Sequence, residues 1–285
     1  MTTTYTNKSI RLTITLDVQG ANNQYVLEGF ACHVSLTKTG GVDFSKASVE
    51  VFGLSIETMA KLTMLSFRPL SRRWNLLQIE AGESGGALST IFKGECTSSF
   101  ADLNGSCPVL KIEAQTGAYP VLKPDPQIAV KGTQSVDDLL TMLSGECGKR
   151  FTNCGVQASL TDCVLNGDPI AKMRTIADAV GADLVIDDDE VVLIPQSKPR
   201  VSDSGVPLIS AETGMIGYPT FSGQGISVSM FFKPELQIGS AVRIESIVPY
   251  ASGTWKIVSL SHDLSANNPS ASSWTTSITG MWLSE

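Results

Sequence analysis

The sequence is poor in charged residues and in histidine, and these shortages limit the chemistry and the partners open to it. Charged side chains make up 17% of its 285 residues, and only two histidines are present. The chain has 21 lysines and arginines against 28 aspartates and glutamates, which gives a net charge of −7. Such a chain repels nucleic acid phosphates at long range, which argues against sequence-specific nucleic acid binding. It does not argue against a surface past which DNA slides.

Cysteine motifs and long apolar runs are also missing. No two cysteines are spaced as C-x-x-C, and the last three do not match a zinc ribbon or finger; the six are Cys32, Cys96, Cys107, Cys147, Cys154 and Cys163. We interpret them as free thiols in a reducing cytoplasm. The N-terminal segment MTTTYTNKSIRLTITL lacks the apolar core of a secretory signal. No apolar run approaches the roughly 20 residues that span a bilayer, so we expect a soluble protein without membrane insertion of its own.

What is present favours β structure. Apolar residues reach 42% of the chain, enough for real cores, and threonine, serine and glycine are plentiful. At about 150 residues per domain, the length predicts two domains, with three small ones as the alternative.

The N-terminal part predicts a β domain organised around residues 48–94. A strand through Val49 turns out at Gly53 into a helix capped by Ser55, and the segments LLQIEAG and STIFKGE then pair across a turn at Gly85 and Gly86. Before this stretch, residues 9–18 alternate as a half-buried strand, a turn is expected at Asn22 and Asn23, and residues 25–36 return as a second strand. With the strand at 109–114, about six or seven strands surround one short helix, at the spacing of a sandwich or barrel.

The middle of the chain predicts a small α+β domain. The proline-containing segment YPVLKPDPQ reads as a linker or extended edge. One helix is expected after the cap Ser135, and a second between the cap Asp168 and Gly181. A hairpin with its tip at residues 187–190 follows, in the segment ADLVIDDDEVVLIPQ.

The C-terminal part predicts a second β region. Strands are expected around residues 226–230, 236–244 and 253–262, and a last strand should carry one apolar face made of Trp274, Thr276, Ile278 and Trp282. The predicted domains are therefore residues 1–118 (β), 119–203 (α+β) and 204–285 (β). A faint repeat links IFKGECTSSFADL at 91–103 with TWKIVSLSHDL at 254–264, and either duplication or chance could produce it.

No catalytic constellation emerges from the residue types. His33 and His262 are interpreted as structural, because Cys32 and His33 point to opposite faces of a strand and no G-x-S-x-G elbow exists. The carboxylates at 187–190 are interpreted as a solvated turn, since they lack the pattern of a calcium loop. Glu80, Glu95 and Glu113 are strand carboxylates that could pair in a glycosidase cleft. We interpret them as outward-facing strand residues.

Two further motifs, a glycine-rich segment and a basic cluster, could bind ligands or partners. The segment GESGG at 82–86 lacks the lysine and hydroxyl residue of a phosphate loop, so a hairpin turn is the simpler interpretation. The basic cluster of Arg68, Arg72, Arg73 and Trp74 could touch a partner's carboxylates or a phosphate, yet an exposed loop is the commoner explanation. The sequence therefore predicts no catalytic, cofactor-binding or metal-binding residues and no cofactor.

The order of these patterns resembles that of baseplate hub proteins of phage tails, most of all contractile ones. The resemblance rests on the segments SVEVFGLSIETMAKL, LLQIEAG, IFKGECTSSF, KGTQSVDDLLTMLSGECG, DPIAKMRTIADAVGADLVIDDDEVVLIP, FFKPELQIGSAVRIES, GTWKIVSLSHDLS and SWTTSITG. It covers nearly the whole chain, although no single motif is specific.

The resemblance implies a mainly β virion protein in which two tube-like β-barrel domains flank a mixed α+β domain. Proteins of this family form a homotrimeric ring that joins the hexameric tail tube to the trimeric central spike and leaves a channel for DNA during ejection. The implied partners are a tail tube or tube-initiator protein, the spike and other baseplate proteins. The implied place of assembly is the host bacterial cytoplasm, and no enzyme activity is implied.

Other interpretations stay open. Trp255, Trp274 and Trp282 could stack on sugars, as in a tail-associated cell-wall hydrolase or a carbohydrate-binding β protein, although their alternation favours burial. A related hub from an injection apparatus or from a non-contractile tail would give the same patterns.

Overall fold

The computed structural model describes residues 7–18, 21–40, 44–64, 75–105, 107–122, 126–200, 205–223, 225–268 and 272–283. Strands account for 54% and helices for 13% of the described residues, which confirms the mainly β prediction. The chain divides into two compact units. The first comprises Met1–Thr37, Lys46–Thr116 and His262–Thr275, and the second Lys38–Ser45, Gly117–Ser261 and Thr276–Glu285. The three predicted domains stay a prediction beside this division.

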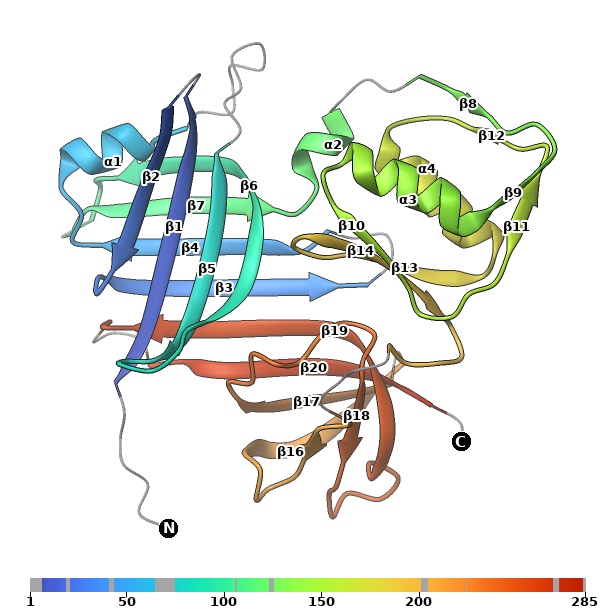
Figure 1. Ribbon diagram of the computed structural model, residues 1–285. Coiled ribbons are helices and arrows are strands. Elements are labelled where there is room, and N and C mark those ends of the chain that lie inside the picture. The colour runs from blue at the N-terminus through green and yellow to red at the C-terminus, as the bar shows by residue number, and fades with distance from the viewer. Residues whose placement is uncertain are drawn as a thin grey trace. The chain divides into compact units, whose positions relative to one another are not determined.

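The first unit is an antiparallel sheet with one short helix (Figure 1). Its elements are β1 (Lys8–Val18), β2 (Ala21–Glu28), β3 (Ala31–Thr39), β4 (Lys46–Phe52), α1 (Ile56–Leu62), β5 (Leu76–Glu83), β6 (Ser89–Asp102) and β7 (Val109–Gln115). The strand order is β3-β4-β7-β6-β5-β1-β2, and residues 262–266 of β19 (Gly253–Ala266) lie beside β3. The strand β2 leaves one edge of this sheet open.

Alternating apolar residues form the core of this unit, as the sequence pattern predicts. One face of every strand except β2 is buried, including Ile10 and Leu12 on β1 and Val49 and Val51 on β4. Among the side chains described in β2, only Leu27 is buried. Helix α1 packs against β6 through its buried residues Met59 and Leu62. The Ser55 cap is confirmed, because the Ser55 hydroxyl accepts a hydrogen bond from the Thr58 amide at 3.1 Å.

Two local predictions in this unit are wrong. Asn22 and Asn23 do not form a turn but pair in β2 with Asp17 and Leu16 of β1, because the ladder between the two strands continues to Ala21. The predicted strand 25–36 is two strands, β2 and β3, separated at Gly29. The φ of +81° at Gly29 takes the backbone out of the extended conformation.

The second unit contains a mixed part with two main helices. Its elements are α2 (Ala118–Leu122), β8 (Ile128–Ala129), β9 (Thr133–Ser135), α3 (Val136–Glu146), β10 (Arg150–Asn153), β11 (Ser159–Thr161), β12 (Val164–Leu165), α4 (Pro169–Ala179), β13 (Ala182–Ile186) and β14 (Glu190–Pro195). Both predicted caps are confirmed, since Ser135 accepts from the Asp137 amide and Asp168 from the Ile170 and Ala171 amides. The strand order β10-β14-β13 forms a small sheet beside α3 and α4 (Figure 1).

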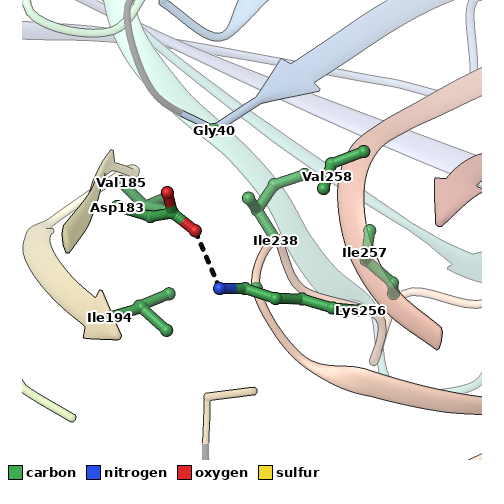
Figure 2. Close-up of a pocket in the computed structure, with 9 residues that line it drawn as sticks. Gly40, Asp183, Val185, Ile194, Ile238, Lys256, Ile257 and Val258 are labelled. Carbon is green, nitrogen blue, oxygen red and sulfur yellow. Dashed lines mark hydrogen bonds and ion pairs between the residues drawn. The ribbon is translucent and has the colours of Figure 1, made fainter. Parts of the chain in front are cut away.

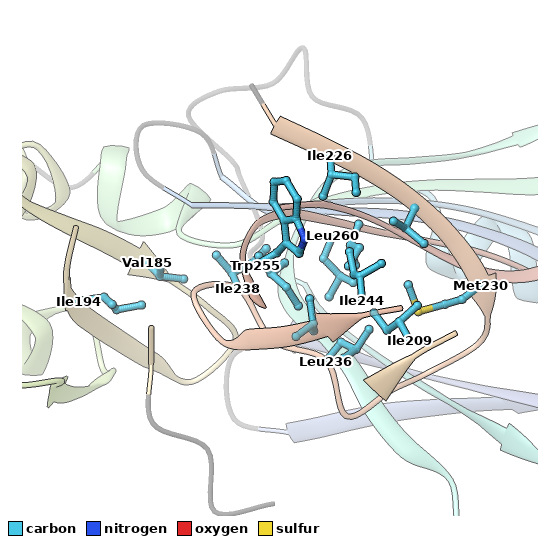
Figure 3. Close-up of a cluster of buried hydrophobic side chains, with 14 of the residues drawn as sticks. Val185, Ile194, Ile209, Ile226, Met230, Leu236, Ile238, Ile244, Trp255 and Leu260 are labelled. Atoms are coloured by element: carbon cyan, nitrogen blue, oxygen red, sulfur yellow. The ribbon is translucent and has the colours of Figure 1, made fainter. Parts of the chain in front are cut away.

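Two strands of the small sheet, β13 and β14, are buried on both faces, which explains why they read as continuous apolar runs. Leu184 and Leu193 face a core shared with α3 and α4. Val185 and Ile194 face the opposite way, into a second core that is formed mainly by the C-terminal strands (Figure 3).

The C-terminal strands complete the second unit. They are β15 (Leu208–Ile209), β16 (Met215–Ser222), β17 (Gly225–Phe231), β18 (Ala241–Ile244), β19 and β20 (Trp274–Trp282). The order is β16-β17-β20-β19, and β18 pairs with both β19 and β15. Neither unit closes into a barrel among the strands that the structure describes. Within those same residues, no helix is long and apolar enough to cross a membrane.

Two predictions for these strands need correction. The predicted strand 236–244 is ordered as a strand only from Ala241, because Gly239 with φ +83° interrupts the extended backbone. The predicted apolar face of β20 is buried at Thr276 and Ile278, whereas Trp282 is 50% exposed near the strand end.

Candidate functional site

The predicted catalytic candidates do not form a charge-relay arrangement. His33 places its Nδ1 atom 2.9 Å from the Ser265 hydroxyl and 3.6 Å from an Asp263 carboxylate oxygen. A serine–histidine–aspartate relay uses the two ring nitrogens for the two partners, whereas here both partners approach one nitrogen. Ser273 also donates a hydrogen bond to Asp263 at 2.6 Å. The cluster therefore links neighbouring segments through polar contacts.

Cys32 lies on the buried side of β3, and burial raises the pKa of its thiol to about 11. At neutral pH this cysteine is a thiol and not the thiolate that a nucleophile requires. His262, the other histidine, is 2% exposed. Both observations agree with structural roles.

The candidate strand carboxylates are engaged locally. Glu80 lies 3.5 Å from the Arg11 guanidinium, and Glu113 accepts a hydrogen bond from Ser48 at 2.8 Å. Both occupy strand positions between buried neighbours, as expected for outward-facing residues, and Glu95 has the same placement on β6. The basic cluster of Arg68, Arg72, Arg73 and Trp74 lies outside the described residues.

The acidic hairpin tip is not a solvated turn. Lys38 donates to Asp187 at 2.7 Å and to Asp188 at 3.1 Å, and the three side chains are only 9%, 14% and 20% exposed. Lys149 adds hydrogen bonds to the backbone carbonyls of both aspartates. Sequence reasoning missed this cluster because Lys38 lies 149 residues before Asp187 and no local pattern connects them.

Burial and charge oppose each other in this cluster, and charge dominates. Burial alone would lower the pKa of Lys38, yet the two carboxylates raise it above its ordinary value. Burial likewise favours the neutral form of Asp187, but Lys38 holds the pKa of this carboxyl below its usual range. The cluster is therefore charged at neutral pH and fixes the hairpin tip.

A second ion pair lies at a small cavity lined by residues of β13 and β14 (Figure 2). Lys256, 1% exposed, donates to Asp183 at 2.7 Å and to the Pro195 carbonyl at 3.0 Å. The cavity measures ≈ 110 Å³ and is otherwise mostly apolar, with Val185 and Ile194 on one side and Ile238 on the other. Arg200 pairs with Glu190 at the start of β14. These pairs explain how charged side chains are accommodated beside an apolar core.

Exposed apolar side chains of the second unit are the feature that suggests binding. Isolated exposed residues are normal on any protein. Here, however, Tyr218 and Ile247 both line one groove, and Tyr250 lies in the loop that forms its side. Of the tryptophans proposed for sugar stacking, Trp255 is 5% exposed and Trp282 contacts it edge-on at 4.9 Å. In the part of the chain that the structure describes, no group of three or more metal-ligating side chains is assembled.

Two comparisons with known proteins, one with family models and one with solved structures, found matches. A family model described as baseplate hub gp41 matches residues 10–271. The 43 kDa tail protein of prophage MuSo2 from Shewanella oneidensis has 10% identity and a TM-score of 0.65, with 95% of this chain and 96% of that chain covered. A tail protein from Neisseria meningitidis MC58 gives the same values.

A third structure comes from a secretion system. The Escherichia coli c3393 protein is described as a component of the type VI secretion system with structural similarity to the T4 bacteriophage tail proteins gp27 and gp5. It has 10% identity and a TM-score of 0.63, with 95% of this chain and 77% of that chain covered. A search of curated proteins found no match. At this level of identity, the structural comparisons establish the fold.

Proposed function

The chain belongs to the baseplate hub gp41 family, and from this premise we propose that it is a non-enzymatic structural hub at the centre of a phage tail baseplate. The membership confirms the resemblance found in the sequence, and a baseplate component is part of the virion. The observation that carries the proposal is the family match over residues 10–271, supported by a fold shared with tail proteins over 95% of the chain.

In this proposal the protein assembles, in the host cytoplasm, as a homotrimeric ring between a hexameric tube and a trimeric spike. Residues 1–118 and 204–285 supply the two tube-like β domains, and residues 119–203 form the mixed insert. Two features support a ring. The first unit leaves β2 as an open edge, and closed rings cover such edges. The two halves of the weak repeat also lie on strands of equal length, β6 and β19, each 14 residues long.

The charge of the protein suits the proposed DNA channel. With a net charge of −7, the chain offers little general attraction to phosphates, so DNA would pass without adhering. Binding to a tail tube or tube-initiator protein and to the spike would then depend on shape and local contacts.

The mass of the purified protein tests the ring. We expect a native mass of three chains, alone or after addition of the spike protein that the proposal makes its partner. A protein that stays monomeric at high concentration, with the spike present, would contradict the proposed ring.

One observation favours a second candidate, a cell-wall hydrolase or a carbohydrate-binding protein. Trp282 and Tyr218 are 50% and 66% exposed and could stack on sugar rings. A wall-degradation assay distinguishes the two, because clear lysis by this chain alone would support the hydrolase and oppose the structural hub.

A further inference from the structure

A groove in the second unit has the features of a protein-docking site. It lies between β16, the turn at 210–213 and the loop at 245–252, and its volume is ≈ 530 Å³. Apolar side chains from three segments line it: Leu208, Met215, Tyr218 and Ile247. Its remaining lining is small or hydroxyl-bearing, apart from two glutamates.

The loop at 245–252 is a rigid side of this groove. The Ser252 hydroxyl accepts from the Ser246 amide at 3.1 Å and donates to the Ser246 carbonyl at 2.9 Å. The Ser246 hydroxyl accepts from the Val248 amide, and the Val248 carbonyl accepts from the Ala251 amide. Ala251 is fully buried, and its carbonyl accepts from the Trp255 indole at 3.0 Å. The loop is therefore fastened both internally and to the core.

This fastened loop holds two large apolar side chains in solvent. Ile247 is 83% exposed and Tyr250 is 91% exposed. Tyr250 also has φ +64°, a conformation that is strained for a bulky residue and costs about 1 kcal/mol or more. Folding alone gains little from exposing both side chains on a strained, hydrogen-bonded loop. A preordered pair of apolar anchors is what a binding surface requires.

The opposite side of the groove is shaped by a bulge in β16. The register with β17 shifts between Ile216 and Thr220, and Gly217 has φ +70°. Bulges re-aim side chains, and here Tyr218 lines the groove at 66% exposure. Pro219 lacks an amide hydrogen, so the bulge and the proline together interrupt β16 as a template for a further strand. Recognition in this groove therefore depends on side chains.

Charge identifies the partner. Both charged residues that line the groove are glutamates, Glu212 and Glu245. Glu245 forms an ion pair with the Arg243 guanidinium at 3.0 Å. Glu212 is exposed and has no ionic partner among the described residues. A segment that fills the groove would gain charge complementarity from a cation near Glu212.

We propose that this groove binds an extended segment of another tail protein, one that inserts an apolar side chain between Tyr218 and Ile247 and places a lysine or arginine beside Glu212. The identity of the partner as a tail protein rests on the proposed function; the chemistry of the groove does not.

Two fluorescent peptides test the proposal on the full-length protein: Thr-Lys-Val-Lys-Leu-Lys-Thr, and the same peptide with glutamate in place of each lysine. Fluorescence polarisation should give at least tenfold tighter binding for the basic peptide. The double variant Ile247→Ser/Tyr250→Ser should weaken that binding at least tenfold, and Glu212→Lys should remove the preference for the basic peptide. Val164 is an apolar residue outside the groove whose side chain is 51% exposed. The substitution Val164→Ser is the matched control and should not change the binding of either peptide. Thermal unfolding of each variant checks that it is folded.

Equal binding of both peptides, no binding at millimolar concentration, or insensitivity to the double variant would each overturn the proposal. A drop in native mass of the double variant would overturn it too, because the groove would then be an interface between copies of this chain. A native trimer that fails to bind the peptides would refute the groove and leave the proposed hub intact. A monomer that binds the peptides as described would refute the proposed trimeric hub and leave the groove intact.

Discussion

Lys38, at the end of β3, extends its ammonium group to within 2.7 Å of the Asp187 carboxylate at the tip of the β13–β14 hairpin. Asp188 approaches the same ammonium at 3.1 Å. Removing the lysine would take a hydrogen-bonded cation away from two largely buried carboxylates. We expect Lys38→Met to lower the free energy of unfolding by about 3–5 kcal/mol, measured by urea denaturation.

The matched control for this variant is Lys61→Met. Lys61 pairs with Glu57 one helical turn away at 2.8 Å, but both side chains are exposed, so no measurable loss of stability is expected. Similar losses for the two variants would show that the Lys38 cluster has no special weight.

The same cluster predicts how stability depends on pH. The pKa of Asp187 is lowered in the folded protein, so its contribution is present above the ordinary aspartate pKa and is lost as the pH falls through the folded value. The raised pKa of Lys38 adds a contribution that is present below the ordinary lysine pKa and disappears only at strongly alkaline pH. Asp187→Asn should therefore flatten the decline in stability below about pH 4, measured by thermal unfolding between pH 2.5 and 7. An unchanged slope in this variant would count against the charged state of Asp187.

Local sequence patterns were sufficient for most elements and for none of the long-range polar contacts. The caps Ser55, Ser135 and Asp168 predicted the starts of their helices correctly. A helix cap bonds to an amide within three residues, so a short stretch of sequence is enough to identify it. The alternation of apolar and polar residues in the first strands predicts their buried faces, because this pattern is also local. The acidic hairpin tip could not be interpreted correctly, since the residue that neutralises it belongs to a distant strand.

The groove was equally hidden from sequence reasoning. Ile247 and Tyr250 read as ordinary apolar residues, and only the hydrogen bonds of Ser246 and Ser252 show that they are held outward. The one available signal was the turn-forming composition of residues 245–253, which predicts a loop but not its rigidity.

A close backbone approach predicts an intolerant glycine at the start of β17. A Cβ atom at Gly225 would lie 2.1 Å from the Gly280 carbonyl oxygen, and the φ of Gly225 is +130°. Gly225→Ala should therefore lower the free energy of unfolding by about 3 kcal/mol or more, because neither backbone can move without breaking the sheet.

Gly145, in the last turn of α3, supplies the control for this substitution. A Cβ atom there would meet nothing within 4 Å, so Gly145→Ala should stabilise the protein by about 0.5–1 kcal/mol through helix propensity. Urea denaturation of both variants gives the comparison. Tolerance of alanine at Gly225 would mean that β17 and β20 are less closely packed than described.

Trp255 connects the core of the second unit to the rigid loop of the groove. Its indole donates to the Ala251 carbonyl at 3.0 Å, and its ring lies edge-on to Trp282 (Figure 3 shows Trp255 within the core). Trp255→Phe removes the hydrogen bond and leaves a small void, so we expect a loss of about 2 kcal/mol in the free energy of unfolding. The amides of Ser246, Val248 and Ala251 should also exchange with solvent faster, since the loop loses its attachment. Trp282→Phe, at a half-exposed position, should leave these amides protected. If both variants speed their exchange equally, the loop is not held by Trp255, and the preordering on which the groove depends must come from the Ser246–Ser252 hydrogen bonds alone.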